Sequence, residues 1–579
     1  MKGLSILMNS YITAIVIVAV IIALYLKYRS DLASSLKKYE KKLRVDFGKK
    51  TDRHIFTREE YEVISHYFKN RSKNTENISG VKTAGIIDDM TWNDLDMDKV
   101  YASMNYCSCQ MGDEYLYDLL HRPLGDAEAL KERGRVIKWF DENEDERTAC
   151  QMAFSQMGRT GKYSFTDHLL KLDEIKEESN ILHYFCILLG VIAIAMIFIN
   201  PPLGFALILA VTAFNVATYF KRKGETDRYV VCFSYIVWTL RSVENLIKND
   251  YEAVSSYISA IRDSYNKLKS LERGMFLLRS GRGLTGSIAE LPLDYLRIFF
   301  HLDQIRFNQM LSKVKLNRNE IFKLEENLGF LDAMISIAHY RRTLKHYCEP
   351  EFLIGEPQRF IGKSLIHPLI ERPVSSDINT DKGILVTGSN ASGKSTFLRT
   401  TALAVLLSET IYTAAAEKCS FSPCRIYSSM SVEDDLIKGE SFYMAEIRGM
   451  KRILDAVRSE NEFPLMCFTD ELLKGTNTVE RVAAGAQILK SLANSRCLLF
   501  AATHDIELTY MLEKYMDNCH FSEIASDGEI SFDYILRKGR AESRDAIKLL
   551  EMMGYEADIT EAAFDTAETF VKTGEWPEI

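Results

Sequence analysis

The stretch Gly383-Ile384-Leu385-Val386-Thr387-Gly388-Ser389-Asn390-Ala391-Ser392-Gly393-Lys394-Ser395-Thr396 decides the fold of the C-terminal part of this chain. Its first five residues predict a short buried strand, and the apolar run at 397–408 predicts a helix after it. Between them lies G-x-x-x-x-G-K-S, in the strand–loop–helix context that a phosphate-binding loop requires. The stretch therefore predicts an α/β domain of the P-loop nucleoside-triphosphatase class.

The residues of this loop have distinct expected roles. Lys394 is expected to reach the β- and γ-phosphates, and Ser395 to ligate Mg²⁺. Backbone N–H groups and the positive end of the helix can hold the remaining phosphate charge. ATP and Mg²⁺ are the expected cofactors. The predicted ATP-binding residues are Gly388, Ser389, Asn390, Ala391, Ser392, Gly393, Lys394, Ser395 and Thr396.

Two later strands support the same site. Residues 464–469 are mostly apolar and end in Asp470-Glu471. Asp470 is expected to hold Mg²⁺, and Glu471 to polarise the attacking water; an acidic strand end without a catalytic role is the alternative. A third strand at 497–502 is followed by His504, which can contact the γ-phosphate. A lone histidine is weak evidence, but this one follows the expected order.

Together these motifs resemble the MutS family, whose ATPase domain belongs to the ABC-type class. The resemblance covers about residues 90–180 and 225–570 and is most specific at 365–510. The segments that carry it are His367-Pro368-Leu369, the P-loop, Gly439-Glu440-Ser441-Phe442-Tyr443, Asp470-Glu471-Leu472-Leu473-Lys474-Gly475-Thr476 and Ala502-Thr503-His504-Asp505.

The resemblance implies a homodimer with composite sites, in which Ser441 acts in trans on the γ-phosphate bound by the partner. A plain helix N-cap is the alternative role of Ser441. The family usually has Ser-Thr-Phe where this chain has Ser441-Phe442-Tyr443. The family's mismatch reader carries a Phe-x-Glu wedge in an N-terminal domain, which this chain does not show. We therefore expect the ATPase, and not mismatch recognition, to carry over.

Apolar segments replace that domain. Residues 3–26 carry no charge, and residues 181–220 contain no Asp, Glu, Lys or Arg. Asn200-Pro201-Pro202 lies in the middle of the second segment and predicts a helical hairpin. Each helix is near the length that spans a bilayer, so three transmembrane helices are expected. The alternatives are a cleaved signal peptide for the first segment and a buried soluble hairpin for the second.

Basic residues predict the orientation of these spans. Six of them, Lys27, Arg29, Lys37, Lys38, Lys41 and Lys42, follow the first span, and Lys221-Arg222-Lys223 follows the third. Both flanks are therefore expected on the inside of the cell (plasma) membrane, with a cytoplasmic ATPase domain. Residues 27–58 hold eleven basic and four acidic residues. Anionic lipid is their simplest partner and DNA phosphate the second.

Charge and cysteine content argue against some other classes of protein. The net charge of −8 argues against a dedicated, overall basic nucleic-acid binder. The eleven cysteines show no paired-ligand spacing, and Cys107 and Cys109 form an isolated C-x-C. Reduced thiols are the simpler interpretation of this pair, and a metal site is the alternative. Scattered cysteines of this kind are typical of a reducing compartment.

Residues 225–273 lack Gly and Pro, and apolar residues recur there at alternating spacings of three and four. This pattern predicts one long amphipathic helix, which we interpret as a lever. The expected segments are an anchor (1–30), a basic juxtamembrane segment and linker (31–85), a helical core and lever (86–180), a transmembrane hairpin (181–220), further lever helices (221–350) and the ATPase domain (351–579).

The expected protein is a membrane-anchored MutS-like ATPase that moves helical levers, with DNA as a candidate target. An ABC-type transport or export subunit is the first alternative. No charge inside the spans marks a substrate path, which disfavours it. A scaffold that only binds ATP is the second alternative, against which Lys394, Asp470 and Glu471 argue.

Overall fold

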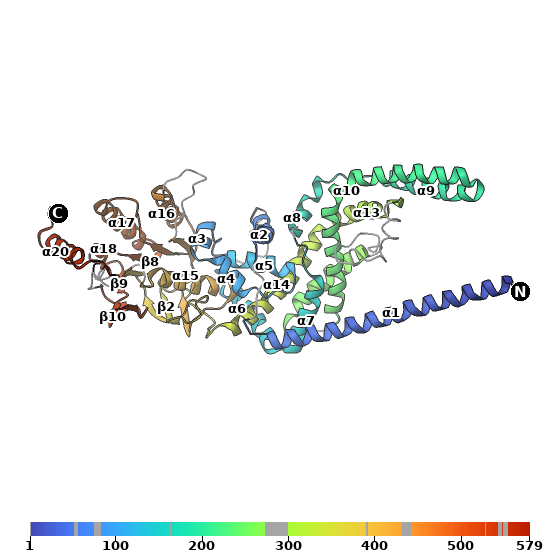
Figure 1. Ribbon diagram of the computed structural model, residues 1–579. Helices are drawn as coiled ribbons and strands as arrows, with labels where there is room; N and C mark the ends of the chain where they lie inside the picture. The colour runs from blue at the N-terminus through green and yellow to red at the C-terminus, as the bar shows by residue number, and fades with distance from the viewer. Residues whose placement is uncertain are drawn as a thin grey trace.

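The computed structural model describes residues 2–50, 56–73, 83–161, 164–249, 251–272, 299–389, 392–430, 442–526, 529–541, 547, 550 and 554–579. Most side chains of residues 2–25 and those of 221–228 are outside this description. The molecule is elongated, with a helical region toward one end and two mixed sheets toward the other (Figure 1).

The helical region contains most of the chain before residue 344. Its α-helices are α1 (Lys2–Asp46), α2 (Arg58–Lys73), α3 (Asp89–Asp94), α4 (Met97–Met104), α5 (Gln110–His121), α6 (Ala127–Glu142), α7 (Glu144–Met157), α8 (Phe165–Leu170), α9 (Ile181–Ile199), α10 (Pro201–Leu246), α11 (Ser255–Leu268), α13 (Leu302–Leu316) and α14 (Arg318–Thr343). Three short 3₁₀ turns accompany them, at Lys171–Glu174, Glu252–Val254 and Lys269–Glu272.

The buried helix α14 organises this region by capping α5. The Asp332 carboxylate of α14 accepts hydrogen bonds from the backbone N–H groups of Ser108 and Cys109, at 2.9 and 3.0 Å, and one from the Cys109 thiol at 3.2 Å. These groups precede the first turn of α5, where backbone donors lack partners within the helix. A Cβ on Gly112 would lie 2.2 Å from Asp332, so only glycine permits this approach.

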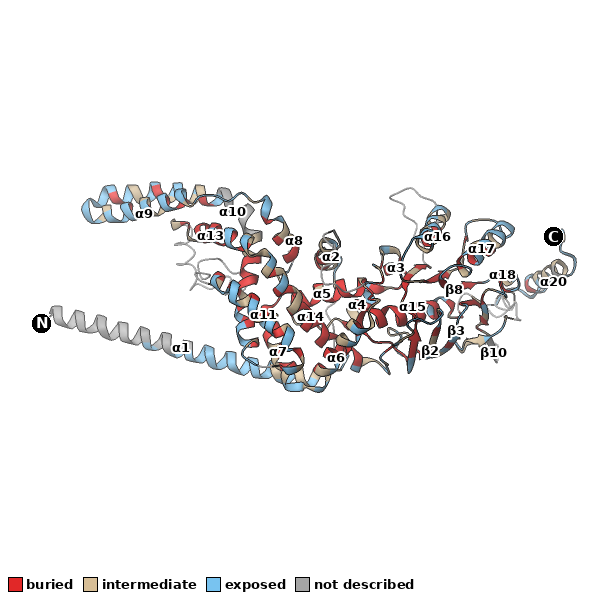
Figure 2. Ribbon diagram, turned by 180° about the vertical axis from the view of Figure 1, so that it is seen from behind, coloured by how far each residue is buried: buried red, intermediate tan, exposed pale blue. Residues whose placement is uncertain are grey.

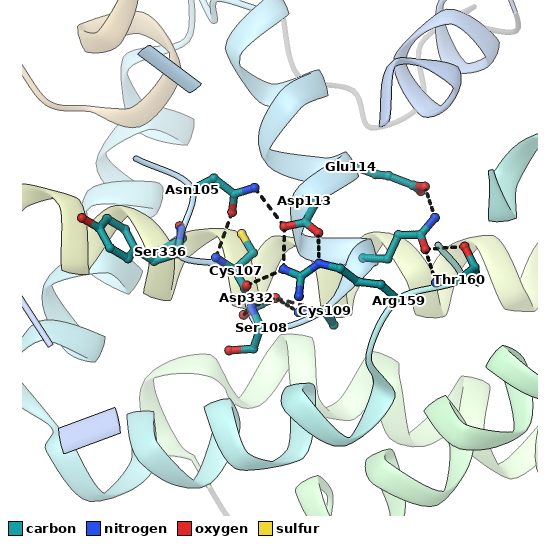
Figure 3. A network of polar contacts seen from close by, with 12 residues as sticks. Asn105, Cys107, Ser108, Cys109, Asp113, Glu114, Arg159, Thr160, Asp332 and Ser336 are labelled. Carbon is teal, nitrogen blue, oxygen red and sulfur yellow. Dashed lines mark hydrogen bonds and ion pairs between the residues drawn. The ribbon is translucent and has the colours of Figure 1, made fainter. Parts of the chain in front are cut away.

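Figure 3 shows that the cap belongs to a wider polar network. The Asp113 carboxylate of α5 accepts a hydrogen bond from the Arg159 guanidinium at 2.6 Å, and Arg159 also donates to the Cys107 carbonyl. Cys107 and Cys109 are buried free thiols. Within the described residues, no group of three His, Cys, Asp or Glu side chains is arranged to hold a metal ion. The C-x-C pair thus takes part in packing around the α5 N-terminus.

The single long helix expected over residues 225–273 is wrong. Helix α10 starts already at Pro201, runs without interruption through residue 225, and ends at Leu246. The polar sequence Lys248-Asn249 follows its end, and α11 begins only at Ser255. The apolar spacing continues across the break because both helices bury faces in the same core, which includes Leu240 and Ile258. Periodicity alone could not locate a turn whose two flanking helices face one core.

The C-terminal part contains two principal sheets. The larger has the order β12-β9-β4-β8-β7-β6, and only β12 runs antiparallel to its neighbour. Its strands are β4 (Ile384–Thr387), β6 (Arg425–Ser429), β7 (Leu465–Asp470), β8 (Cys497–Thr503), β9 (Asp517–His520) and β12 (Arg537–Lys538). The second sheet, β1-β5-β2-β3, comprises β1 (Glu351–Phe352), β2 (Phe360–Leu365), β3 (Ser376–Thr380) and β5 (Lys418–Phe421).

Helices and a hairpin complete this part. They are α15 (Lys394–Ile411), α16 (Phe442–Arg458), α17 (Thr478–Ala493), α18 (Ile506–Met511), α20 (Ala557–Thr573) and the strand pair β10 (Glu523–Ser526) and β11 (Glu529–Phe532). Helix α15 is buried along nearly its whole length beneath the sheet. A mostly parallel six-stranded sheet with helices confirms the expected α/β class for the C-terminal part, and helices dominate the region before it.

Helix α9 and the first half of α10 form the expected hairpin, with the bend at Asn200. Both are long and apolar enough to cross a membrane, and only 22% of each apolar window is buried. Figure 2 shows the hairpin extending from the body with mostly exposed residues along it. The first apolar segment, 3–26, lies within α1, and most of its side chains fall outside the described residues. Helix α1 continues unbroken past residue 30 to Asp46.

A buried carboxyl pair joins α5 to α14. Thr166 donates to Glu325 at 2.9 Å, and Gln110 donates to Glu114 at 2.7 Å. Burial raises the pKa of Glu325 to about 7, and burial together with the neighbouring Glu325 raises the pKa of Glu114. The folded region therefore holds a proton that an unfolded chain releases at lower pH. Its contribution to stability is complete below the ordinary carboxyl pKa of 4.5 and is lost as pH rises through about 7.

We expect Glu325→Gln to remove the part of this pH dependence that Glu325 contributes, because the amide is neutral at every pH. Hydrogen exchange of the α14 amides, converted to opening free energies, measures the effect. The decrease in opening free energy from pH 6 to pH 8 should be smaller in the variant than in wild type by about 1 kcal/mol. The exposed-site control Glu128→Gln should keep the wild-type decrease. If the opening free energy changed equally between pH 6 and pH 8 in wild type and in Glu325→Gln, the proposed protonation of Glu325 would be contradicted.

Candidate functional site

The parallel sheet brings the predicted motifs to one edge. Strand β4 pairs with β8, and β8 pairs with β7, all in the same direction. In this register Thr387 lies opposite Thr503, and Asp470 lies opposite Ala502. The P-loop follows β4, Glu471 follows β7 and His504 follows β8. The carboxyl ends of adjacent parallel strands thus assemble the site from segments more than 100 residues apart, at the edge where α/β sheets bind ligands.

The P-loop encloses its own lysine. Gly388 has φ of +145° and Gly393 has φ of +101°, so both bends use backbone conformations that favour glycine. The Lys394 ammonium lies inside the loop and donates to the Gly388 and Ser389 carbonyls at 2.6 and 2.8 Å. It is also 3.8 Å from the Glu471 carboxylate. The loop therefore presents one buried cation at the N-terminus of α15, as phosphate binding requires.

The two expected Mg²⁺ ligands meet directly. The Ser395 hydroxyl donates to Oδ2 of Asp470, and the buried Oδ1 of Asp470 has no hydrogen-bond partner among the described residues. Burial raises the pKa of Asp470, while the Ser395 hydrogen bond and nearby lysines act in the opposite direction. A hydroxyl beside a carboxylate with an unused oxygen fits a hard divalent cation, which prefers oxygen ligands. Mg²⁺ held there would supply the positive charge that a triphosphate needs.

Two neighbouring side chains, His504 and Lys474, hold Glu471 in a defined position. The His504 ring nitrogen lies 3.7 Å from its carboxylate, and the Lys474 ammonium lies 2.9 Å away. The neighbouring His504 ring, followed by the Lys474 ammonium, lowers the pKa of Glu471 to about 2. The carboxylate therefore stays ionised and is suited to orient and polarise a water molecule. Glu471 has φ of +49° and Leu473 has φ of +58°, so this turn is strained at the site.

Three features of the site were not anticipated from the sequence. The Tyr534 ring lies 3.1 Å from where a Cβ on Gly393 would be, so an aromatic face borders the P-loop. Arg481 of α17 makes a two-pronged ion pair with Asp505, at 3.0 and 2.6 Å, beside His504. Lys474 pairs with Glu471. Only Lys474 lay within a recognised motif; no local pattern marks Tyr534 or Arg481.

Some predicted residues cannot be placed. Asn390, Ala391 and Ser441 lie outside the described residues. The trans role of Ser441 therefore stays a prediction. The remaining loop residues that were predicted, from Gly388 to Thr396, lie between β4 and the first turn of α15.

Comparison with known proteins agrees with this geometry. Residues 384–571 match the family described as MutS domain V, which is an ATPase domain. The match includes β4, the P-loop, the Asp470-Glu471 strand end and His504. The chain therefore contains a P-loop ATPase domain, and residues 384–571 are similar to MutS domain V.

The individual relatives share low sequence identity with this chain and are longer than it. The chain is 28% identical to MutS protein homolog 4 of Mus musculus over 269 residues, which is 44% of this chain and 27% of that protein. It is 27% identical to the DNA mismatch repair protein MutS of Thermotoga maritima over 327 residues, 54% of this chain and 40% of that protein. It is 25% identical to the DNA mismatch repair protein MutS of Thermus thermophilus over 341 residues, which is 58% of this chain and 39% of that protein. The chain thus matches less than half the length of these relatives.

Glu471→Gln should keep ATP binding and lose most turnover, because the amide no longer polarises water while the phosphate contacts stay intact. We expect kcat to fall by about 10²–10³-fold, with the dissociation constant for ATP nearly unchanged. Steady-state phosphate release and equilibrium binding of a labelled nucleotide measure the two quantities. The exposed Glu507→Gln on α18 serves as the control. Unchanged turnover in Glu471→Gln would refute the role given to Glu471.

Proposed function

We propose that this protein is a membrane-anchored, MutS-like ATPase that dimerises through its nucleotide domains and moves its helical region at the inner membrane face. The observation that carries the membrane part is the exposure of the α9–α10 hairpin. Its apolar side chains lie outward on nearly every side: Ile181, Leu182, Tyr184, Phe185, Leu188, Val191, Ile192, Ile194, Phe198, Ile199, Leu203, Phe205, Leu209 and Phe214. A helix of a soluble core would bury most of such residues.

Small residues of the hairpin lie at close contacts. The buried positions of α9 include Cys186, Gly190 and Ala193, which recur at helical spacing, and a Cβ on Gly190 would lie 2.8 Å from the Phe299 ring. On α10, a Cβ on Gly204 would lie 2.5 Å from the backbone of Ile197, so the two helices touch near the bend. Small residues that let backbones approach are typical of helix pairs in lipid, where apolar burial no longer drives association. The large side chains are left to face outward.

Polar contacts fix the base of the hairpin to the body. Nδ1 of His183 on α9 lies 2.9 Å from Nδ1 of His301, which precedes α13. His301 donates from Nε2 to the Asn215 carbonyl of α10 at 2.9 Å, and Asn215 donates to the Phe299 carbonyl at 2.7 Å. The hairpin therefore has a fixed attachment to the helical region, as a membrane anchor that transmits movement requires.

The spatial arrangement supports insertion from one side. Helix α1 and the hairpin extend in the same general direction from the end of the molecule that lies away from the ATPase domain (Figure 1). Basic residues exposed on α1, including Lys27, Arg29 and Lys37, follow its apolar segment. They fit anionic lipid headgroups on the inner face, with the ATPase domain in the cytoplasm.

DNA is the second candidate partner of the helical region. The names of relatives such as the Thermotoga maritima DNA mismatch repair protein MutS motivate it. An ABC-type transport role is the remaining alternative. ATPase activity stimulated by duplex DNA, with equal response to matched and mismatched duplexes, would favour a DNA target that lacks mismatch reading.

Impermeant maleimide labelling in intact cells tests the topology. Phe198→Cys lies at the hairpin tip and Leu316→Cys at the end of α13, and these side chains are exposed to the same extent, 85% and 86%. Only Phe198→Cys should react before permeabilisation, and both should react afterwards. The wild-type protein should also stay with membranes in alkaline carbonate. Release by carbonate, or equal labelling of both variants in intact cells, would contradict the proposal.

Mixing of inactive variants tests the composite site. Ser441→Arg chains keep Lys394, and Lys394→Ala chains keep Ser441. If Ser441 acts in trans, a heterodimer of the two contains one wholly wild-type site and should regain up to about half of wild-type activity. A chain with both changes, paired with wild type, should have no intact site. Absence of rescue in verified heterodimers, with activity retained in the second mixture, would reject the trans role.

A further inference from the structure

Helix α3 lies against the ATPase domain although some 330 residues of sequence separate the two. Asp94, at the end of α3, is fully buried and accepts hydrogen bonds from the Ser428 hydroxyl at 2.6 Å and the Met430 N–H at 2.9 Å. Thr91 accepts from the Ser428 N–H at 3.2 Å. Ser428 lies near the end of β6 and Met430 directly follows the strand; β6 is the neighbour of the strand that carries Asp470. The helical region is thus attached directly beside the catalytic edge.

Helix α16 also contacts α3 and its N-cap residue. Asp88, the N-cap of α3, forms an ion pair with Arg452 of α16. A Cβ on Gly449 would lie 3.0 Å from the Ser429 hydroxyl and 3.3 Å from the Met90 sulfur. At Gly449, α16 therefore packs closely against both β6 and α3. Because packed interiors resist compression, a shift of α3 must move α16 or break these contacts.

The first turns of α16 contact the catalytic loop. The Glu446 carboxyl of α16 is buried beside the backbone N–H groups of Lys474 and Gly475. Burial raises the pKa of Glu446, and these two N–H groups act in the opposite direction. A Cβ on Gly475 would lie 2.8 Å from the Tyr443 Cβ, so the loop packs directly on the start of the helix. Lys474 in turn holds Glu471 through its ammonium group at 2.9 Å. The contacts run without a gap from Asp88 through α16 to Glu471.

We propose that α16 relays the position of α3 to the water-polarising Glu471, with Glu446 and Arg452 as positioning residues for ATP hydrolysis. Glu446 fixes the backbone of the 474–475 turn, and the Asp88–Arg452 pair fixes where α16 stands relative to the helical region. Glu471 sits in a strained turn with a left-handed backbone, so its carboxylate depends on outside contacts for its direction. Movement of the helical region and turnover are thereby coupled through one helix.

Kinetics of the full-length protein test this relay. Glu446→Ala should lower kcat by about tenfold or more, while the dissociation constant for ATP changes by less than about threefold, because Glu446 touches neither the P-loop nor Mg²⁺. Glu446→Gln should restore most of kcat, since its amide keeps the shape of the carboxyl and still places an oxygen beside the two N–H groups. Loss of affinity in parallel with kcat, or a Glu446→Gln variant as slow as Glu446→Ala, would overturn the positioning role.

A variant at the α3 end of the relay provides a second test. This variant is informative even if Glu446→Ala does not fold. Asp88→Ala removes the ion pair with Arg452 and should lower kcat in the same direction. Asp89→Ala, the exposed neighbour on the same helix, is the matched control and should leave kcat unchanged. In the double variant with Glu446→Ala, Asp88→Ala should add no further loss, because the link is already broken. Equal kcat for Asp88→Ala and Asp89→Ala, or fully additive losses in the double variant, would overturn the relay.

Discussion

Parallel pairing of β4, β8 and β7 is the constraint on which the rest of the structure depends. All residues of β4 and β8 are buried, and Phe468 of β7 stacks on Phe500 of β8 with ring centroids 5.3 Å apart. This packing fixes the register that places Asp470 opposite Ala502. Ser395 can reach Asp470, and His504 can reach Glu471, only because these three strands end at one edge. A slip of one residue would turn their side chains to the opposite faces.

The helical region connects this edge to the apolar hairpin through a small number of stiff elements. Helix α10 contains 46 residues, so it extends about 70 Å from the hairpin bend into the helical core. Helix α14 holds α5 through the Asp332 cap, and α3 attaches the same region to β6 and α16. Such an arrangement suits a protein in which nucleotide turnover and movement at the far end depend on each other.

Much of the catalytic edge could be predicted from the sequence, because its signals are local. The P-loop lies between a buried strand and a helix, and Asp470 and His504 each follow an apolar strand. Short-range pattern fixes such strand ends, and parallel topology then brings them together. The hairpin bend at Asn200 was likewise marked by the two prolines that follow it.

Other features could not be predicted because they depend on long-range packing. The break after Leu246 was missed, since α10 and α11 bury apolar faces in one core and keep the spacing of a single helix. The docking of Asp94 on β6 had no signal beyond its place in a short polar segment. Tyr534 reaches the P-loop from a distant part of the chain, and single-sequence patterns carry no information about that contact. The side-chain packing of 3–26 lies outside the described residues, so its role as a span stays a prediction.

The most direct measurement for the central claim is ATP turnover by the purified full-length protein across a Mg²⁺ series, compared with Asp470→Asn. The account places Mg²⁺ between Ser395 and Asp470, where one carboxylate oxygen has no partner within the part of the chain that the structure describes. Wild-type turnover should require Mg²⁺ and saturate with it, and Asp470→Asn should need roughly tenfold or more Mg²⁺ for half-maximal activity. Turnover without a divalent cation, or the same Mg²⁺ dependence in both proteins, would contradict the account.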